Sequence, residues 1–531
     1  MLRTHLTVLE QAVSRNPSTT LFKVPVIDTV TGKVTNYEPI SVGQFAQDVD
    51  ATAKYWAHVL KRDGIPTKSV IGICLGGVQY IDAVNLYSVA RAGYIPHSFS
   101  GVLLPGAAVV KGLLQKSNAR AFIRFSDVKE VLKDIQEVPV YDPVTSIDDI
   151  AIYRESCLSP MSEMNENDIA VIFNTSGSVS GSPKLVTGTY RWLDGLIHKH
   201  GGAFIPNRSR NGIVNWMANV CHVGQFGALV YAIQSGSCVV QMKNCVDEKE
   251  ILAAIDLASF TGISLLSPLL VRMLALSKTD RDVLSSLVSL NSIVSSGAAL
   301  PRAEEEYARQ YNINIVNVFG MTEPGGVMAA SQGTRMDPLN ALRPMNVPGL
   351  SYQFVPVSSS GEDPHSDLLE LVVLPDSIDC PDAEFLDPAD GCFHTGDLWR
   401  QVESGYIHCG RNDDWIMCRN TCRCDARAIE DNVRQTCSDL VSDCITVGNN
   451  RPSPVIFIES KTNSSDEDVK KSIFKRIEPF HSQRMVHERI QSSDMIVIVA
   501  PNTLPRAAKG HIRRRAVEDA YKEVLDQIYD N

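Results

Sequence analysis

Residues 174–184, with the sequence NTSGSVSGSPK, combine hydroxyl groups, glycines and one lysine in a short stretch. The apolar run of residues 168–173 precedes them and predicts a buried strand. Glycine lets a backbone approach an anion, hydroxyl and N–H groups donate to its oxygens, and lysine adds a positive charge. The stretch is therefore a candidate phosphate-binding loop. The alternative is a Gly/Ser-rich surface loop, and a Walker A motif is excluded because no Gly-Lys-Ser/Thr follows at the required spacing.

The overall charge limits the classes of partner. The chain of 531 residues has 50 Lys or Arg and 61 Asp or Glu, so its net charge is −11 at pH 7. This balance disfavours general nucleic-acid binding, which usually needs a basic surface. A bound polyanion must be held by local donors against the overall field. The hydrophobic content of 44% and charged content of 21% are ordinary for a chain that forms a core, and the length predicts several domain-sized units.

The sequence predicts a cytoplasmic location. The first residues lack the apolar core of a signal peptide, and no uninterrupted apolar run approaches the length of a membrane span. The last residues, YDN, are neither a prenylation nor a peroxisomal signal. Thirteen cysteines without a secretory signal favour reduced thiols. The spacing of Cys418, Cys422 and Cys424, with His408 and Cys409 upstream, matches no common pair of zinc ligands.

Strand-like and helix-like segments alternate over most of the chain. The apolar residues of segment 43–61 recur at helical spacing and predict an amphipathic helix, which Gly64 and Pro66 end. Alternation of this kind predicts an α/β architecture with largely parallel sheets. The other predicted strands are 69–75, 119–125, 138–142, 168–173, 211–217, 237–241, 292–296 and 313–319, and the other predicted helices are 79–93, 191–200, 226–233, 247–258 and one opened by Pro301.

The pattern changes after about residue 345. Short strand-like runs such as 368–374 lie between turn-rich loops such as 358–367, which predicts a small, mainly antiparallel unit. A second change near residue 410 predicts a compact mixed domain. In it, segment 460–477 is a polar loop that continues as a helix, and 495–500 is a strand.

Further motifs follow the loop at ordered positions. They are VARAGYIP at 89–96, SSGAALP at 295–301, NVFGMTEPGG at 317–326, DGCFHTGDLW at 390–399, GRNDDWI at 410–416 and LPRAAKGHIRRR at 504–515. With the loop, this series resembles the adenylate-forming superfamily of acyl- and aryl-CoA synthetases, luciferases and the adenylation domains of peptide synthetases. The resemblance covers nearly the whole chain in the family's order. Within the family, the chain is most similar to fungal stand-alone, NRPS-like AMP-binding enzymes.

The resemblance implies a fold and a reaction. It implies a large N-terminal domain, residues 1–409, made of two α/β subdomains and a small β-barrel at about 345–409. It also implies a small, mobile C-terminal α+β domain, residues 410–531. In such enzymes a carboxylate attacks the α-phosphorus of ATP, giving an acyl-adenylate and pyrophosphate. Because the attack brings two anions together, catalysis depends on charge neutralisation and alignment.

The resemblance assigns the phosphate and metal contacts. Lys184 would hold the β- and γ-phosphates, Thr322 would contact the α-phosphate and Glu323 would carry Mg²⁺. A helix cap is the alternative for the Thr-Glu pair. The loop is one residue longer than the family's usual pattern, so that Ser180 replaces one of the expected hydroxyls if they are displaced by one position. The implied phosphate-loop residues are Thr175, Ser176, Gly177, Ser178, Ser180 and Gly181.

The nucleoside contacts come from other motifs. Asp397 would accept both ribose hydroxyls, because one carboxylate has two acceptor oxygens. Phe319 stands where the family usually has Tyr and would stack on adenine. Arg411 would reach the ribose or the α-phosphate. The alternatives are a turn residue for Asp397, a core residue for Phe319 and a surface ion pair for Arg411. The remaining implied nucleotide-binding residues are Ser296, Gly297, Ala298, Asn317, Gly320 and Met321.

One histidine points to the acid substrate. His222 resembles the family histidine that lies beside the reacting carboxylate, and a structural histidine is the alternative. Residues 216–226 contain no Asp or Glu. Amino-acid-activating relatives usually hold the substrate ammonium with an Asp in this region. The sequence therefore favours a plain carboxylic acid, aliphatic or aromatic.

The C-terminal motifs imply a moving domain. Asp413 would be the hinge about which the C-terminal domain swings between two half-reactions, and Met417 replaces a frequent Lys. Lys509 is the candidate adenylation lysine, although the family's usual order is Gly-Lys and this chain has Lys509-Gly510-His511. Strict alignment puts His511 at the catalytic position, but a largely neutral imidazole stabilises phosphate charge poorly at pH 7. The alternative for Lys509 is a basic surface cluster with Arg506 and Arg513–Arg515.

We therefore expect an ATP-dependent, AMP-forming acid–thiol ligase that uses Mg²⁺ and CoA. A first alternative is a stand-alone adenylation enzyme that loads the phosphopantetheine arm of a carrier protein in trans. The carrier would be a separate partner, because no carrier or reductase domain precedes Asn531. A second alternative, supported by the altered closing motif, is a non-catalytic relative that senses a nucleotide or acyl ligand.

Overall fold

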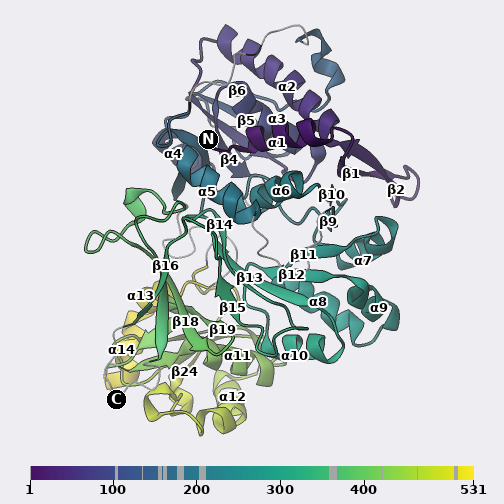
Figure 1. The fold of residues 1–531 in the computed structure, drawn as a ribbon. Helices are drawn as coiled ribbons and strands as arrows, with labels where there is room; N and C mark the ends of the chain where they lie inside the picture. The colour runs from purple at the N-terminus through teal and green to yellow at the C-terminus, as the bar shows by residue number, and fades with distance from the viewer. Residues whose placement is uncertain are drawn as a thin grey trace. The chain divides into compact units, whose positions relative to one another are not determined.

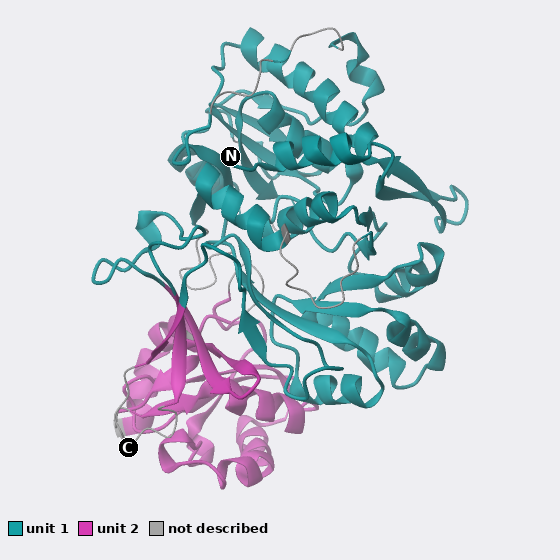
Figure 2. Ribbon diagram, viewed as in Figure 1, with its two compact units in different colours: residues 1–175, 182–352, 373–393 teal, residues 176–181, 353–372, 394–531 magenta. Residues whose placement is uncertain are grey.

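A computed structural model shows the fold (Figure 1). It describes residues 2–101, 106–133, 135–153, 158, 164–175, 184–201, 211–357, 367–419, 422–462, 464–506 and 512–530. These residues divide into two compact units (Figure 2). Unit 1 has the described residues within 1–175, 182–352 and 373–393, and unit 2 has those within 353–372 and 394–531. The domain boundary predicted between residues 409 and 410 stays a prediction.

The first sheet of unit 1 is mainly parallel. Its strand order is β6-β5-β3-β4-β7-β8, in which β3 to β7 run parallel and β8 pairs antiparallel with β7. The predicted strand 168–173 is β7, so the prediction of an α/β fold is confirmed. The strands are β3 (Val70–Leu75), β4 (Ile95–Ser100), β5 (Ala121–Arg124), β6 (Val140–Tyr141), β7 (Ile169–Asn174) and β8 (Leu185–Thr189).

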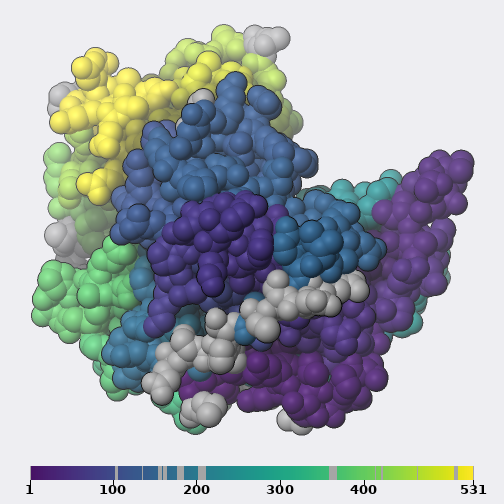
Figure 3. Space-filling model, turned by 90° about the horizontal axis from the view of Figure 1, so that it is seen from above, coloured from purple at the N-terminus to yellow at the C-terminus, as the bar shows by residue number. Residues whose placement is uncertain are grey.

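A second sheet begins with a hairpin that the sequence analysis did not predict. Its order is β2-β1-β10-β9, with β1 (Thr20–Ile27), β2 (Val34–Ser41), β9 (Ile213–Asn215) and β10 (Cys238–Val240). The hairpin of β1 and β2 projects from the rest of unit 1 (Figures 1 and 3). Its turn residue Val30 is 91% exposed, so this end of the hairpin contributes nothing to the core.

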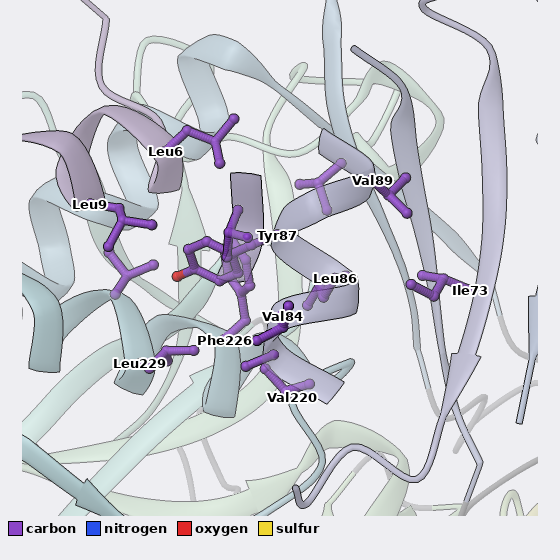
Figure 4. Packing of buried hydrophobic residues seen from close by; sticks show 14 of the residues in the cluster. Leu6, Leu9, Ile73, Val84, Leu86, Tyr87, Val89, Val220, Phe226 and Leu229 are labelled. Carbon is purple, nitrogen blue, oxygen red and sulfur yellow. The ribbon is translucent and has the colours of Figure 1, made fainter. Parts of the chain in front are cut away.

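Helices pack against these sheets and enclose an apolar core. Leu6 and Leu9 of α1, Tyr87 of α3 and Phe226 of α6 meet in it (Figure 4). Burial of each such side chain stabilises the fold by about 1.5–3 kcal/mol. The helices of this part are α1 (His5–Arg15), α2 (Val42–Arg62), α3 (Tyr80–Arg91), α4 (Ala107–Lys116), α5 (Tyr190–Gly201) and α6 (Val223–Ser235), with 3₁₀ turns at Ser126–Val128 and Asp148–Tyr153.

The third group of strands in unit 1 changes direction at its end. The parallel strands β11, β12 and β13 are followed by β14 and β15, which pair antiparallel. Their bounds are β11 (Gly262–Leu266), β12 (Ser292–Ser296), β13 (Ile315–Met321), β14 (Gly326–Ser331) and β15 (Leu342–Pro344). The associated helices are α7 (Glu248–Leu257), α8 (Ser267–Ser277), α9 (Arg281–Ser289) and α10 (Arg302–Gln310), and a 3₁₀ turn lies at Ala383–Phe385.

Unit 2 starts with the predicted antiparallel strands. Their order is β19-β18-β17-β16, and β18 pairs antiparallel with β19. The helix predicted within 460–477 is α12, which extends farther and includes Pro479 near its end. The bounds are β16 (Tyr352–Pro356), β17 (Leu368–Val373), β18 (Phe393–Val402), β19 (Gly405–Arg411), β20 (Trp415–Met417), β21 (Arg423–Asp425), α11 (Ala426–Thr436), β22 (Val441–Val447), β23 (Val455–Ser460), α12 (Asp466–His481), β24 (Ile496–Val499), α13 (Arg514–Ala520) and α14 (Lys522–Asp530), with 3₁₀ turns at Asn412–Asp414, Val486–Glu488 and Ser493–Met495. None of the described helices combines the length and the apolar character needed to span a membrane.

The predicted amphipathic helix gives a stability test. Trp56 of α2 is fully buried. Trp56→Ala should lower the free energy of unfolding by about 3–5 kcal/mol, through lost burial and the cavity left behind. The measurement is denaturant unfolding of the full-length protein. Lys61→Ala, an exposed position of the same helix, is the control. Equal stability of the two variants would contradict the packing described.

Candidate active site

The two ends of the candidate phosphate loop are hydrogen-bonded to each other. The N–H of Thr175 donates to the carbonyl of Lys184 at 2.9 Å, and the N–H of Lys184 donates to Thr175 Oγ1 at 3.0 Å. Lys184 is exposed, and its ammonium lies 5.7 Å from the ring centroid of Phe385. The other predicted loop residues, Ser176, Gly177, Ser178, Ser180 and Gly181, lie outside the described residues.

A buried histidine supports the start of this loop. His97 Nε2 lies 3.1 Å from Asn174 Oδ1, and Asn174 Nδ2 donates to the carbonyl of Ser98 at 2.9 Å. Burial lowers the pKa of His97 to about 4, so its imidazole is neutral at pH 7. A neutral imidazole has one N–H donor, and Asn174 Oδ1 accepts it. Sequence analysis missed His97, whose only signal was its place directly after the motif at 89–96.

The segments predicted to contact the nucleoside base lie side by side. Leu266 pairs with Ser296 and Ser295 pairs with Asn317, so β11 and β12 end level with each other and β13 continues past them to Met321. Ser296 and Phe319 are half-buried, and Gly297 and Ala298 are exposed. In open α/β sheets, ligands bind at this edge. A half-buried Phe319 combines packing with a ring surface available for contact.

Asn317 is held by a residue of α10 that sequence analysis missed. Its Nδ2 donates to Glu305 Oε1, which also accepts from Asn340 Nδ2 at 3.1 Å. Its backbone N–H donates to Ser331 Oγ at 2.9 Å. Burial raises the pKa of Glu305. Because a carboxylate oxygen accepts hydrogen bonds, Glu305 fixes which way the Asn317 amide faces.

Thr322 and Glu323 lie in the turn between β13 and β14. Gly320 pairs with Val327, Met321 pairs with Gly326, and Gly325 and Gly326 have positive φ angles of 75° and 94°. The alternative of a helix cap for Thr322 and Glu323 is therefore wrong, because the residues that follow are a turn and a strand. Positive φ suits glycine, which explains the Gly-Gly pair after Pro324.

Two side chains of α5 hold this turn. Trp192 Nε1 donates to the carbonyl of Glu323 at 2.9 Å, and Lys199 Nζ donates to the carbonyl of Pro324. The Trp192 ring also lies against Gly188 of β8, where an added Cβ would approach the ring to 2.6 Å. Helix α5 therefore connects the strand after Lys184 with the turn that carries Glu323.

His222 caps α6 at its N-terminus. Its Nδ1 accepts from the N–H of Gly224 at 3.1 Å, and the side chain is exposed. Gln225 Oε1 accepts from the N–H groups of Met217 and Ala218, both at 3.1 Å, and fixes the preceding loop. The capping bond supports a structural role for His222. Because the side chain is exposed, contact with a substrate stays a prediction.

In unit 2, Asp397 is buried between two cationic or donor groups. Its Oδ1 lies 2.8 Å from His408 Nε2, and its Oδ2 lies 3.3 Å from Arg411 Nη1. Asp397 lies within β18, so its interpretation as a turn residue is wrong. A carboxylate offers about two acceptor sites per oxygen, and among the described residues His408 and Arg411 each occupy one site on a different oxygen. Sequence analysis noted His408 only as a possible zinc ligand and missed this contact.

The segment before Asp397 is fixed by a second carboxylate. Glu370 Oε1 accepts from the N–H of Gly396 at 2.9 Å, and Glu370 Oε2 lies 3.0 Å from His394 Nδ1. Thr395 Oγ1 donates to the carbonyl of Leu371 at 2.7 Å. The whole His-Thr-Gly-Asp motif is thereby attached to β17.

The predicted hinge lies in a 3₁₀ turn of unit 2. Asp413 is in Asn412–Asp414, directly after β19. Next to it, Asp414 Oδ2 accepts from the N–H of Arg411 at 3.2 Å, and Asp414 Oδ1 lies 3.8 Å from Arg514 Nη2. The hinge role of Asp413 stays a prediction.

The basic cluster near the C-terminus is partly internal. Arg506 pairs with Asp443 at 2.8 Å and with Glu459 at 2.7 Å, and Arg514 pairs with Glu430 at 2.6 Å. Arg506 and Arg514 are thus structural ion-pair partners in place of free surface charges. Lys509 and His511 lie outside the described residues, so which of them takes the catalytic position stays open.

The oxygen donors of unit 1 suit a hard cation. Glu323 supplies a carboxylate and Thr322 a hydroxyl, and Mg²⁺ prefers oxygen ligands. Among the residues that the structure describes, no group of three His, Cys, Asp or Glu side chains is arranged to hold a metal. Mg²⁺ commonly binds through one or two carboxylates together with substrate phosphates. The donor set therefore fits Mg²⁺ brought in with a nucleotide.

The chain matches known protein families and individual proteins. Residues 34–350 match the family model for AMP-binding enzymes, and residues 413–531 match the model for the AMP-binding enzyme C-terminal domain. The chain is 29% identical over 520 residues to the AMP-binding domain-containing enzyme iboA of Amanita muscaria, covering 94% of this chain and 98% of that protein. It is 25% identical over 276 residues to the adenylate-forming reductase Nps11 of Serpula lacrymans, covering 50% of this chain and 24% of that protein.

Solved structures with the same fold cover nearly the whole chain. The anthranilate CoA ligase AuaEII in complex with anthranoyl-AMP has a TM-score of 0.70 at 16% identity, covering 98% of this chain and 97% of that one. The o-succinylbenzoate CoA synthetase MenE of Bacillus subtilis, in complex with ATP and magnesium ion, has a TM-score of 0.72 at 15% identity, covering 96% and 99%. At these identities the likeness shows the fold alone.

The tight hairpin gives a test of the site geometry. A Cβ added at Gly320 would lie 2.4 Å from the carbonyl oxygen of Gly326, which is backbone and cannot move aside as a side chain would. Gly320→Ala should therefore destabilise the protein by about 1–3 kcal/mol, measured by denaturant unfolding. Gly112→Ala in α4, where nothing lies within 4 Å, is the control and should be neutral or stabilising. Unchanged stability of Gly320→Ala would contradict the close approach.

Proposed function

The chain belongs to the family of AMP-binding enzymes, and we propose that it activates a carboxylic acid with ATP and transfers the acyl group to CoA. One observation carries the proposal: the turn with Thr322 and Glu323 is anchored to α5, the helix that directly follows Lys184 and β8. The backbone next to the hydroxyl of Thr322 and the carboxylate of Glu323 is thereby held by the helix that follows Lys184 and β8 in the chain. This arrangement suits a reaction that depends on phosphate alignment.

The first half-reaction joins two anions. A carboxylate oxygen of the acid attacks the α-phosphorus, the bond from that phosphorus to the bridging oxygen breaks, and pyrophosphate leaves. Lys184 would neutralise the β- and γ-phosphates together with the loop residues from Thr175 to Gly181, and Thr322 would contact the α-phosphate. Glu323 would hold Mg²⁺, which supplies positive charge to the phosphate oxygens when it is bound. His222 would lie beside the attacking carboxylate.

Residues of unit 1 would contact the base, and a residue of unit 2 would contact the ribose. Phe319 would contact adenine, with Ser296–Ala298, Asn317, Gly320 and Met321 around it. Asp397 would accept the ribose hydroxyls at acceptor sites other than those that His408 and Arg411 occupy. Lys509 would supply the adenylation ammonium, because an amine is charged at pH 7 and an imidazole mostly is not.

The second half-reaction forms the thioester. The thiolate sulfur of CoA attacks the acyl carbonyl carbon, and AMP leaves with the electron pair of the broken bond. We propose that unit 2 residues after the hinge at Asp413 change orientation between the two steps. CoA is favoured because AuaEII and MenE, which share the fold, are named as a CoA ligase and a CoA synthetase. A carrier-bound phosphopantetheine stays the second candidate acceptor, because its thiol could attack the acyl carbon in the same way.

We propose that the substrate is a plain carboxylic acid. The proposed location of the enzyme is the cytoplasm. The segment from Trp216 to Phe226, which includes His222, contains no Asp or Glu to pair with a substrate ammonium. An unpaired ammonium next to this segment would be desolvated without compensation. Amino acids are therefore expected to be poor substrates.

The proposed function is tested by pyrophosphate release with Mg-ATP. The panel contains fatty, aryl, dicarboxylic and amino acids, each with and without CoA. Acid-dependent release that turns over only with CoA supports the proposal, whereas turnover that CoA does not improve indicates a carrier protein as acceptor. Glu323→Gln should lower kcat about 100-fold, because one stabilising group is lost from the transition state.

Two further results complete this test. Glu306→Gln, a surface position of α10 with 56% side-chain exposure, should keep wild-type activity. Absence of release with every acid, in protein that binds ATP, would reject catalysis and favour the ligand-sensing alternative.

Ribose recognition gives a separate prediction. His408→Phe removes the donor on Asp397 Oδ1 and should raise KM for ATP about ten-fold, because a hydrogen bond to a charged group contributes about 1.5–3 kcal/mol. The His408→Phe variant should also have a smaller ratio of kcat/KM for ATP to kcat/KM for 2′-deoxy-ATP than the wild type. His408→Gln keeps a donor and should behave closer to wild type, and His58→Phe on α2 is the control. An unchanged preference in His408→Phe would contradict this role.

A further inference from the structure

Lys199 is a lysine with no solvent exposure. Its side chain and that of Asp379 are both 0% exposed, and Lys199 Nζ lies 2.8 Å from Asp379 Oδ2. The two residues are 180 positions apart in the chain. Buried ion pairs contribute little net stability, because both charges lose their hydration. A pair at this depth calls for a role other than stabilisation.

The carboxylate of Asp379 is fixed in place by its surroundings. Ser377 Oγ donates to Oδ1, and Tyr352 Oη donates to Oδ2. Burial raises the pKa of Tyr352 well above its usual value, so the phenol keeps its proton and remains a donor. These two hydrogen bonds therefore fix the orientation of the Asp379 carboxylate, whose Oδ2 accepts from Lys199.

The segment that carries Asp379 is also fixed against α5. Arg191 Nη2 donates to the carbonyl of Asp376 at 3.1 Å. A Cβ added at Gly195 would lie 3.0 Å from the carbonyl oxygen of Ile378, so the two backbones touch. Arg191, Gly195 and Lys199 recur every four residues and lie on one helical face. The ammonium of Lys199 thus has a set position relative to the helix.

From this position Lys199 reaches the turn. It donates to the carbonyl of Pro324, and Trp192 donates to the carbonyl of Glu323. Two successive peptide groups of the turn are held by two side chains of one helix. The orientation of these peptides sets the direction in which the Glu323 side chain leaves the backbone. A charged donor holds a carbonyl more strongly than a neutral one does.

We propose that Lys199, held by Asp379, is a positioning residue that fixes the Glu323–Pro324 peptides so that the Glu323 carboxylate is preset for Mg²⁺. The proposal rests on the proposed function, in which Glu323 carries Mg²⁺. In this proposal the buried pair orients the backbone next to Glu323, the proposed metal ligand. It also explains why an ammonium group is retained at a depth where an apolar residue would fill the space.

The test compares two double variants that both remove the buried charges. Lys199→Met/Asp379→Leu removes the donor to Pro324 and avoids leaving an unpaired charge, so the fold should be kept. Lys199→Gln/Asp379→Asn is the matched variant, because its amide keeps a donor at this position. The readout is the affinity for Mn²⁺ of protein saturated with a non-hydrolysable ATP analogue, measured from free Mn²⁺ by electron paramagnetic resonance. Affinity for the analogue without metal is measured in parallel.

We expect Mn²⁺ to bind about ten-fold more weakly to the Met/Leu variant, which corresponds to the loss of a hydrogen bond from a charged donor. Analogue binding without metal should stay within about two-fold, and the Gln/Asn variant should bind Mn²⁺ close to wild type. A loss of stability elsewhere in the protein should not by itself weaken Mn²⁺ binding. Leu287→Ala, a fully buried position in α9, controls for it and should lower the melting temperature without changing Mn²⁺ affinity.

Each other outcome is decisive. Wild-type Mn²⁺ affinity in the Met/Leu variant overturns the proposal. Should that variant not fold, Trp192→Phe removes the other donor, to Glu323, and leaves the ion pair intact. It must then weaken Mn²⁺ binding, and unchanged binding overturns the proposal. Absence of metal-dependent analogue binding in the wild type overturns the proposed function itself, and with it this inference.

Discussion

The ion pair between Lys199 and Asp379 is the interaction on which the candidate site of unit 1 depends. Its ammonium holds the carbonyl of Pro324, and its carboxylate ties the helix α5 to the segment around residues 376–379. Removing one partner of a buried pair costs about 3–5 kcal/mol, although the intact pair adds little stability. Such a pair is specific in geometry. It places a helix, a turn and a distant loop in one arrangement.

A chain with a net charge of −11 must bind a polyanion by arranging charge locally. Within each unit, buried or half-buried carboxylates are engaged by donors. Asp397 is engaged by His408 and Arg411, Glu370 by Gly396 and His394, and Asp379 by Lys199. These carboxylates therefore act as acceptors that orient other groups. Lys184 remains exposed at the end of the loop, where a phosphate would approach.

The relatives that the chain matches differ in how much of their own length it covers. The chain covers 98% of iboA and 24% of Nps11. In unit 2, Arg506 and Arg514 are committed to internal ion pairs with Asp443, Glu459 and Glu430.

The sequence by itself determined the fold class and the order of the motifs. The apolar run before the loop became β7 and the amphipathic pattern became α2, whereas the site residues from Thr175 to Arg411 were assigned by resemblance to a family and stay predictions. Local periodicity suffices for these two elements, because it reflects which face of one element is buried. Only the tertiary structure decided that Thr322 and Glu323 lie in a turn and that Asp397 lies in a strand. It also decided that His97 contacts Asn174, Glu305 contacts Asn317, Lys199 contacts the carbonyl of Pro324 and His408 contacts Asp397. Lys199 meets a partner 180 residues away, and no local pattern records a contact that exists only once the chain is folded.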